Sequence, residues 1–177
     1  MNPAWRIQTG RLVLTPVGWR DLPDLRVLKG DPGVYGQMLG GVRSPGQVAA
    51  ELAEDVSFWA ARGAGMWLVR DASTAAALGT TGLHERLDGL GTALRVAFRP
   101  EVRGHGLARE AAAAALQFAH YRAGLERVVA VARDTNIASR TLLGAIGMRP
   151  CGTFERDGSQ MLVFESVATP RPVGAWH

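Results

Sequence analysis

The chain has 177 residues, which is the length of one ordinary domain and leaves little room for a second core. Hydrophobic residues make up 47% and charged residues 20%, which excludes a disordered chain, poorer in apolar residues, and a membrane protein, richer in them. The formal charge of +4 is the difference between 20 basic and 16 acidic residues, and Lys29 is the single lysine among the basic ones. These residues are scattered along the sequence, so the charge does not favour a dedicated nucleic-acid surface.

The single cysteine, Cys151, excludes an intramolecular disulfide framework and a structural zinc site made of several cysteines. An unpartnered cysteine is typically a small buried hydrophobic residue, and we expect this one to have no catalytic role. Residues 1–11 have no apolar run of the signal-peptide kind, and no stretch approaches the roughly 20 apolar residues of a membrane span. We therefore expect a cytoplasmic protein without a membrane partner.

The first third of the chain predicts one strand and two helices. Apolar and polar residues alternate from Arg11 to Val17, and the proline in this stretch closes the strand. A short helix follows from Asp21 to Lys29, and a longer one runs from Ser44 to Gly63, because serine caps helix starts and glycine ends helices. The apolar residues of the longer helix recur at helical spacing, which predicts one buried face: Val48, Leu52, Val56 and Trp59.

The remainder predicts an antiparallel meander followed by alternating helices and strands. The expected elements are strands at Met66–Arg70, Leu78–Glu85 and Thr92–Phe98, a helix ending near Arg122, a strand at Arg127–Ala132, a helix at Ile137–Ala145 and a hairpin of Thr153–Phe154 with Met161–Ser166. We predict a single α/β domain over residues 1–169, with a mixed, mostly antiparallel sheet and helices on both faces, followed by a tail at 170–177. A ligand is expected at the carboxyl end of the crossover strand.

The segment from Arg99 to Glu110 is the part that indicates chemistry. Its glycines permit tight backbone geometry, and successive amides together with the start of a helix make a site for phosphate oxygens, to which Arg103 adds a fixed charge. A dinucleotide-binding motif is excluded because Arg109 occupies the position of the third small residue, and the chain has no P-loop Gly-Lys-Ser/Thr. A plain strand-to-helix turn is the simpler interpretation of the glycines alone.

What remains resembles the acetyl-CoA signature of the GNAT superfamily of N-acetyltransferases, Gln/Arg-x-x-Gly-x-Gly/Ala, which Arg103, Gly106 and Ala108 satisfy. The resemblance extends over most of the chain, through Thr9–Leu14, Leu78–Leu83, Asp134–Ser139 and Gly147-Met148. These features look most like the branch that acetylates the N-termini (alanine or serine) of ribosomal proteins, a branch that also holds enzymes for other amines.

The resemblance implies that acetyl-CoA is the co-substrate and that no metal takes part. It implies a pyrophosphate held by the amides of Val102, Arg103, Gly104, His105, Gly106, Leu107 and Ala108, and a pantetheine arm between the strands Thr92–Phe98 and Arg127–Ala132. The amides of Ala97 and Phe98 look like oxyanion donors, Asn136 and Ser139 would face the coenzyme, and Ser139 looks like the proton donor to the thiolate. Without the resemblance, two simpler interpretations are equally good: Asn136 only caps the next helix, and Ser139 has no functional role in its first turn.

The base is less clear, because Ala93 and Leu94 stand where the family often has a glutamate. The nearest titratable residues are His84 and Glu85 at the end of the preceding strand, and His84 is favoured because its ordinary pKa suits proton abstraction near neutral pH. Asp157 in the last hairpin turn is a third candidate. His120 is expected to be structural. Four large side chains could line the acceptor pocket, although such residues more typically belong to the core: Tyr35, Met38, Trp59 and Trp67. Trp59 falls on the apolar stripe of its helix, so we expect it in the core.

The sequence is therefore identified as a GNAT-like N-acetyltransferase that moves an acetyl group from acetyl-CoA to a primary amine, either a protein N-terminus or a small-molecule amine. The missing strand carboxylate leaves a catalytically weak acyl-CoA-binding module as the alternative, and the basic charge leaves a nucleic-acid-binding domain as a third. A homodimer is common in the family, although the sequence shows no interface.

Overall fold

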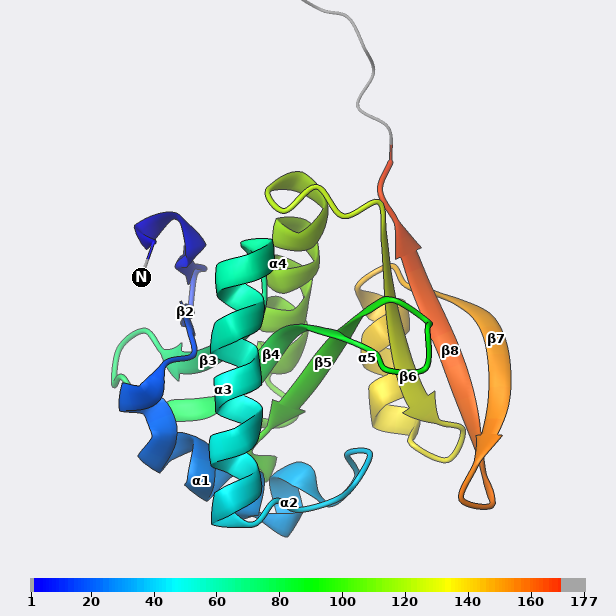
Figure 1. Cartoon of the computed structure of the whole chain (residues 1–177), viewed down its shortest axis with the longest axis horizontal. Helices are drawn as coiled ribbons and strands as arrows, with labels where there is room; N and C mark the ends of the chain where they lie inside the picture. Colours follow the sequence, from blue (N-terminus) through cyan, green and yellow to red (C-terminus); the bar gives the residue numbers. More distant parts are fainter. Residues whose placement is uncertain (1, 170–177) are drawn as a thin grey trace, which may run out of the picture.

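The structure is a computed structural model that describes residues 2–169 (Figure 1). One eight-stranded sheet has the order β1-β2-β3-β4-β5-β6-β8-β7. The strands are β1 (Ile7–Gln8), β2 (Leu12–Pro16), β3 (Met66–Asp71), β4 (Ala77–Glu85), β5 (Thr92–Phe98), β6 (Arg127–Arg133), β7 (Arg149–Arg156) and β8 (Ser159–Val167). The helices are α1 (Leu22–Gly30), α2 (Pro32–Tyr35), α3 (Pro45–Arg62), α4 (Leu107–Tyr121) and α5 (Ile137–Ala145), with 3-10 turns at Pro3–Trp5, Trp19–Asp21 and Pro100–Val102.

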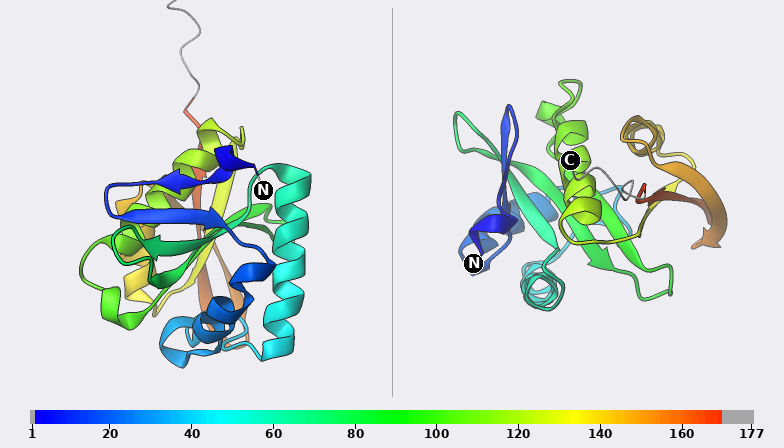
Figure 2. Two further views of the ribbon diagram at one scale, coloured as in Figure 1. Left: turned by 90° about the vertical axis from the view of Figure 1, so that its left-hand side faces the viewer. Right: turned by 90° about the horizontal axis from the view of Figure 1, so that it is seen from above.

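Neighbouring strands are antiparallel everywhere except at β5 and β6, which are parallel and connected through the crossover helix α4. Helices α1, α2 and α3 cover one face of the sheet, and α4 and α5 cover the other, as the two turned views show (Figure 2). The predicted fold class is confirmed. The predicted tail, Pro170–His177, lies outside the described residues, and no helix within residues 2–169 is long and apolar enough to cross a membrane.

Helix α3 forms where the sequence predicts it, for the expected reasons. The Ser44 hydroxyl accepts from the backbone N–H of Gln47, and the Gln47 side chain accepts from the Ser44 N–H, which makes a capping box. Gly63 ends the helix in the left-handed conformation with φ of +63°. Trp59 is a core residue, because its ring packs between Trp5 and Trp67 and its Nε1 donates to the carbonyl of Met66 at 2.8 Å.

The structure differs from the local expectations at four points. The two-residue strand β1 and the helix α2 were not predicted: Asp31 and Pro32 end α1, but the Asp31 carboxylate also accepts from the Gly33 N–H at 2.7 Å and so begins a new helical turn. Strand β7 is longer than Thr153–Phe154. Cys151 is exposed rather than buried, because β7 is an edge strand whose side chains lie mostly in solvent.

Candidate functional site

The central feature of the site is an opening between β5 and β6, the two parallel strands. They are paired only at Ala93 and Val129, so their backbones separate along the rest of their length. We call the space between Leu94–Phe98 and Ala130–Arg133 the slit. It lies at the carboxyl ends of the crossover strands, which is where ligands bind in sheets of this kind.

The strand register decides which backbone groups face the slit. Arg99 donates its N–H to Leu78 and Arg86 donates to Gly91, so odd-numbered residues of β5 are paired with β4 and even-numbered ones point toward β6. The amide of Ala97 therefore belongs to the ladder with β4, whereas those of Val96 and Phe98 face the slit. An extended ligand chain that carries amide groups can satisfy such backbone groups.

The opposite wall of the slit follows the same logic. Asp134 donates its N–H to Gln160 and Ala168 donates to Glu126, so the residues of β6 that are paired with β8 are the even-numbered ones. The backbone groups of Val131 and Arg133 consequently face β5. Both walls of the slit thus present backbone donors and acceptors that no strand of the described chain pairs.

The glycine loop (residues 99–106) leads from β5 into α4. Gly104 and Gly106 have φ of +81° and +74°, a backbone conformation that side chains with a Cβ rarely adopt. After the loop, α4 begins beside the end of β5, and no side chain caps the first N–H groups of this helix. Arg103, His105 and Gly106 are exposed. The loop can therefore hold an anion through its backbone.

Two distant segments hold the glycine loop in place. The Arg103 guanidinium donates to the carbonyl of Gly33 in α2 at 2.7 Å, which uses one of its donors. On the other side, Arg11 donates to the His105 carbonyl at 2.8 Å and is ion-paired with Glu110 at 2.7 Å. Hydrogen bonds from Thr9 and Arg11 lower the pKa of Glu110 although burial raises it. These contacts join residues that are far apart in the sequence, so the glycine motif alone did not predict them.

Asn136 and Ser139 lie where β6 passes into α5. The Asn136 side chain accepts from the backbone N–H of Ser139 at 3.1 Å, so Asn136 caps α5. The Ser139 hydroxyl is half-buried and has no hydrogen-bond partner within residues 2–169. Its oxygen is therefore free to serve a ligand, while the side-chain oxygen of Asn136 is already used.

His84 and Glu85, the predicted base candidates, point to opposite faces of β4, as successive strand residues must. His84 is paired with Ala93 and lies on the face that α3 covers, whereas Glu85 is exposed and accepts from the Thr92 hydroxyl at 3.2 Å. Burial, together with the charge of Arg95, lowers the pKa of His84 to about 3. The imidazole is neutral at neutral pH and is a weak base.

A cluster of ionised side chains beneath α3 had no sequence signal. We call Lys29, Arg43, Glu51, Asp55 and Arg95 the charge cluster; it draws on α1, α3, β5 and the segment before α3. Lys29 is 2% exposed, and its ammonium lies 2.7 Å from Glu51 and 3.9 Å from Asp55. Arg43 is also ion-paired with Glu51. Burial raises the pKa of Asp55 to about 6, and Lys29 and Arg95 only partly offset that effect.

The other candidates lie apart from the slit. Tyr35 and Trp67 are fully buried core residues, and Asp157 is an exposed turn residue with φ of +51°. His120 is structural as expected, because its nitrogens contact the Leu125 carbonyl at 2.6 Å and the Ser166 hydroxyl at 2.9 Å. Among residues 2–169, no group of three or more His, Cys, Asp or Glu side chains is arranged to hold a metal.

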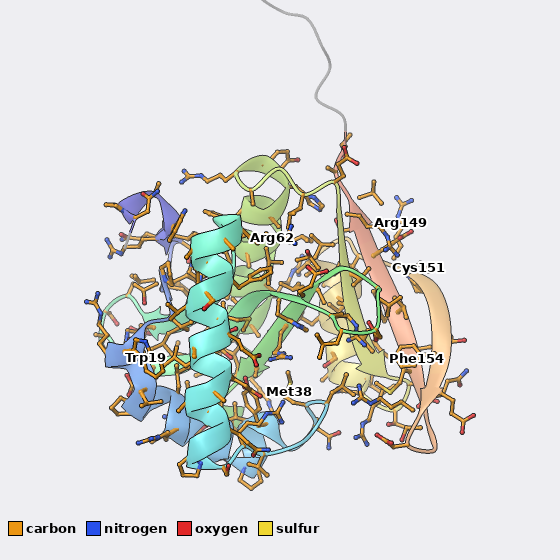
Figure 3. All side chains as sticks on the ribbon, in the orientation of Figure 1. Trp19, Met38, Arg62, Arg149, Cys151 and Phe154 are labelled. Atoms are coloured by element: carbon orange, nitrogen blue, oxygen red, sulfur yellow. The ribbon has the colours of Figure 1, made fainter. Side chains whose placement is uncertain are left out.

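A cavity of about 560 Å³ lies on the exposed side of β7, beyond the slit. Its lining includes Leu90 from the β4–β5 turn, and Cys151, Phe154 and Val163 from the last hairpin. Figure 3 shows Cys151 and Phe154 along β7, with Met38 on the far side of the opening beside the foot of α3. The region between α3 and β7 is thus the part of this face that no helix covers (Figure 1).

Comparisons with known proteins identify the family and the fold. Residues 11–149 match the family model described as an acetyltransferase (GNAT) domain. A putative GnaT-family acetyltransferase from Bordetella pertussis has a TM-score of 0.80 at 24% identity, covering 90% of this chain and 98% of that one. The ribosomal-protein-S5-alanine acetyltransferase from Vibrio fischeri has a TM-score of 0.75 at 14% identity, covering 92% and 96%. No curated protein matches the chain.

A third similar structure bears on the coenzyme. It is a ribosomal L7/L12 alpha-N-protein acetyltransferase, RimL, in complex with coenzyme A, with a TM-score of 0.78 at 16% identity over 92% of this chain and 98% of that one. A spermidine N-acetyltransferase from Vibrio cholerae also shares the fold, with a TM-score of 0.70 at 16% identity over 90% and 95%. At these identities the likeness concerns the fold.

Proposed function

The chain belongs to the GNAT acetyltransferase family, and from that premise we propose that it transfers an acetyl group from acetyl-CoA directly to a primary amine of a protein N-terminus or a small molecule. The observation that supports this proposal best is the slit, whose unpaired backbone groups lie next to the exposed glycine loop. A cytoplasmic location and a homodimer belong to the proposal as properties typical of the family.

In this proposal the glycine loop binds the pyrophosphate of acetyl-CoA. The amides from Val102 to Ala108 surround the anion, the α4 start adds its partial positive charge, and Arg103 supplies the donors that Gly33 leaves free. The pantetheine arm lies in the slit, where its amide groups pair with the backbones of β5 and β6. The thioester then reaches the middle of the sheet.

The chemistry needs three groups. The amine nitrogen attacks the acetyl carbonyl, whose oxygen becomes negative and is stabilised by the slit-facing amide of Phe98, with the neighbouring Ala97 shaping the wall. The nitrogen–carbon bond forms and the carbon–sulfur bond breaks. Ser139 donates a proton to the departing thiolate and regains one from water, while the proton lost by the amine passes to a base. No covalent enzyme intermediate is required.

For the base, His84 remains the proposal from sequence, with Glu85 and Asp157 as its rivals, and the charge cluster adds Asp55. The pKa values separate two of them. Removing His84 should abolish an acidic limb of kcat/KM near pH 3, whereas removing Asp55 should abolish one near pH 6, because a base acts only above its pKa. Variants His84→Ala, Glu85→Ala and Asp55→Asn, each measured from pH 2.5 to 9, assign the role.

The test of the function is release of the CoA thiol from acetyl-CoA with a panel of peptide N-termini, amino acids and polyamines. Turnover that requires the amine and yields the N-acetyl product supports the proposal. Tight acetyl-CoA binding by calorimetry without turnover on any amine would instead favour the acyl-CoA-binding module. Salt-sensitive binding to DNA or RNA that CoA leaves unchanged would favour the nucleic-acid-binding domain.

A further inference from the structure

Arg95 lies on the sheet face that α3 covers, beside the region between α3 and β7 that no helix covers; we take this face to receive the amine and call it the acceptor face. It lies on β5 between Ala93, which packs with Val129 and Val163, and Ala97, which packs under α3, so its side chain emerges on that same face. Its cross-strand partner in β4 is Gly82, which has no side chain. A Cβ at Gly82 would come within 2.3 Å of the Gly65 carbonyl oxygen, so the backbone of Gly65 and Met66 fills the space beside Arg95 that a side chain at this position would take.

Arg95 has no partner within residues 2–169, unlike the other cations of the charge cluster. Lys29 and Arg43 are both ion-paired with Glu51, whereas the Arg95 side chain makes no hydrogen bond or ion pair although the residue is half-buried. Asp55 feels the Arg95 charge but lies beyond ion-pair distance, and its pKa stays raised to about 6. A guanidinium in this environment has several donors that only a ligand or water can satisfy.

A second arginine faces the same opening from the other wall of the slit. Arg133 follows Val129 and Val131 on one face of β6, and its Nε is buried without a hydrogen-bond partner. Each strand of the slit therefore presents an unpaired guanidinium on the acceptor face. The neutral imidazole of His84 and the carboxyl of Asp55 are the other titratable groups that interact electrostatically with Arg95.

We propose that Arg95 binds a carboxylate carried by the amine acceptor, so that the preferred substrates are amino acids or peptides with an acidic group close to the reacting amine. The inference rests on the proposed acetyl transfer and narrows its acceptor class. A guanidinium fork matches a carboxylate with two parallel hydrogen bonds, which fixes the orientation of the acceptor as well as its affinity. Arg133 completes the anion site from β6.

The first experiment compares acceptors that differ only in one charge. Thiol release by the wild-type protein from acetyl-CoA is measured with two pairs of acceptors. The first pair is serine and serinamide, and the second is the peptide amides Ser-Glu-Ala and Ser-Gln-Ala. We expect kcat/KM to be roughly 10- to 100-fold higher for the carboxylate member of at least one pair, the range for hydrogen bonds to a charged group. Equal values in both pairs would overturn the proposal.

The second experiment removes the guanidinium. Arg95→Gln should lower kcat/KM for the carboxylate member by this factor more than for the amide member, so that the preference disappears, and Arg95→Lys should restore part of it. Arg26→Gln is the matched control, since Arg26 is an exposed arginine of α1 without a partner in the described chain. Circular dichroism checks that both Arg95 variants are folded. If kcat/KM falls equally for the carboxylate and the amide acceptor in Arg95→Gln and in Arg95→Lys, Arg95 has no specificity role.

A binding measurement separates this inference from the proposed function. Calorimetry of N-acetylserine against N-acetylserinamide, with CoA present, needs no turnover. Preferential binding of the carboxylate that Arg95→Gln abolishes supports the site even if no acetyl transfer occurs. A carboxylate can also come from the acyl donor: if succinyl-CoA replaces acetyl-CoA with an Arg95-dependent gain on serinamide, the carboxylate belongs to the donor and the proposal is overturned.

Discussion

The glycine loop and the charge cluster are built in opposite ways. The loop consists of consecutive residues that present backbone groups to solvent, and its positive φ angles at Gly104 and Gly106 define its shape. The cluster consists of side chains from separate elements, with Lys29 almost completely buried. In the proposed site, backbone groups of consecutive residues form most of the donor side, and charged side chains from separate elements form the acceptor side. Substitutions in the two regions should therefore affect different ligands and respond differently to pH.

The largest expected effect is in the loop. Gly106→Val should weaken acetyl-CoA binding roughly 10³-fold, because a β-branched residue at φ of +74° moves the amides that bind phosphate, and each such charged hydrogen bond contributes about 1.5 to 3 kcal/mol. Gly124→Val is the control: Gly124 has φ of +69° with open space around it, at the far end of α4. Calorimetry should show normal affinity for that variant, and unchanged affinity in Gly106→Val would refute the loop assignment.

Ser139→Ala tests a proposed catalytic group that belongs to neither region and lies in the first turn of α5. We expect kcat and kcat/KM to fall together by roughly 10²-fold, the lower range for lost acid catalysis, with acetyl-CoA affinity retained. Thr135→Ala, which alters an exposed hydroxyl just before the α5 cap, should behave like wild type. Steady-state thiol release with the true acceptor measures both. Wild-type turnover in Ser139→Ala would remove Ser139 from the mechanism.

The shifted pKa values of Asp55 and His84 should also change how the free energy of unfolding depends on pH. The raised pKa of Asp55 means that the folded state binds its proton more tightly, so this residue lowers stability as pH rises from about 4 to 6. The lowered pKa of His84 acts in the opposite direction, raising stability as pH rises from about 3 to 6.5. The two contributions offset each other in the wild type.

Single variants should separate these contributions. In denaturant unfolding between pH 4 and 6, Asp55→Asn should gain stability relative to wild type as pH rises, and His84→Gln should lose it, each by about 2 kcal/mol across the interval. The double variant should return to the wild-type slope. Parallel curves for all four proteins would show that neither group has a shifted pKa.

The smallest expected effect concerns the support of the loop from the first strands. Glu110→Gln keeps the shape of the side chain but removes the charge that Arg11 pairs with, and it should weaken acetyl-CoA binding only about 3- to 10-fold, in line with a partly exposed ion pair of about 1 kcal/mol. Calorimetry at low and high salt measures it, since wild-type affinity should approach that of the variant as salt screens the pair. A loss as large as that in Gly106→Val would make this ion pair part of the binding site itself.

The contrast between loop and cluster also explains what the sequence predicts. Helix α3 and the loop follow from neighbouring residues, such as the Ser44 cap and the glycines before α4, so local patterns are sufficient. The charge cluster depends on where α1, α3 and β5 pack, and nothing near Asp55 in the sequence marks its burial. The direction of the Ala97 amide likewise depends on strand register, which turns and bulges set across the whole sheet.

The position of Cys151 has a practical consequence. It is the single cysteine of the chain, it is exposed on an edge strand, and it lines the cavity beside Phe154 and Leu90. A thiol-reactive fluorophore or spin label will therefore attach at one defined place without any background mutation. Such a label sits beside Leu90 of the β4–β5 turn and Phe154 of β7, in the same protein whose kinetics are measured.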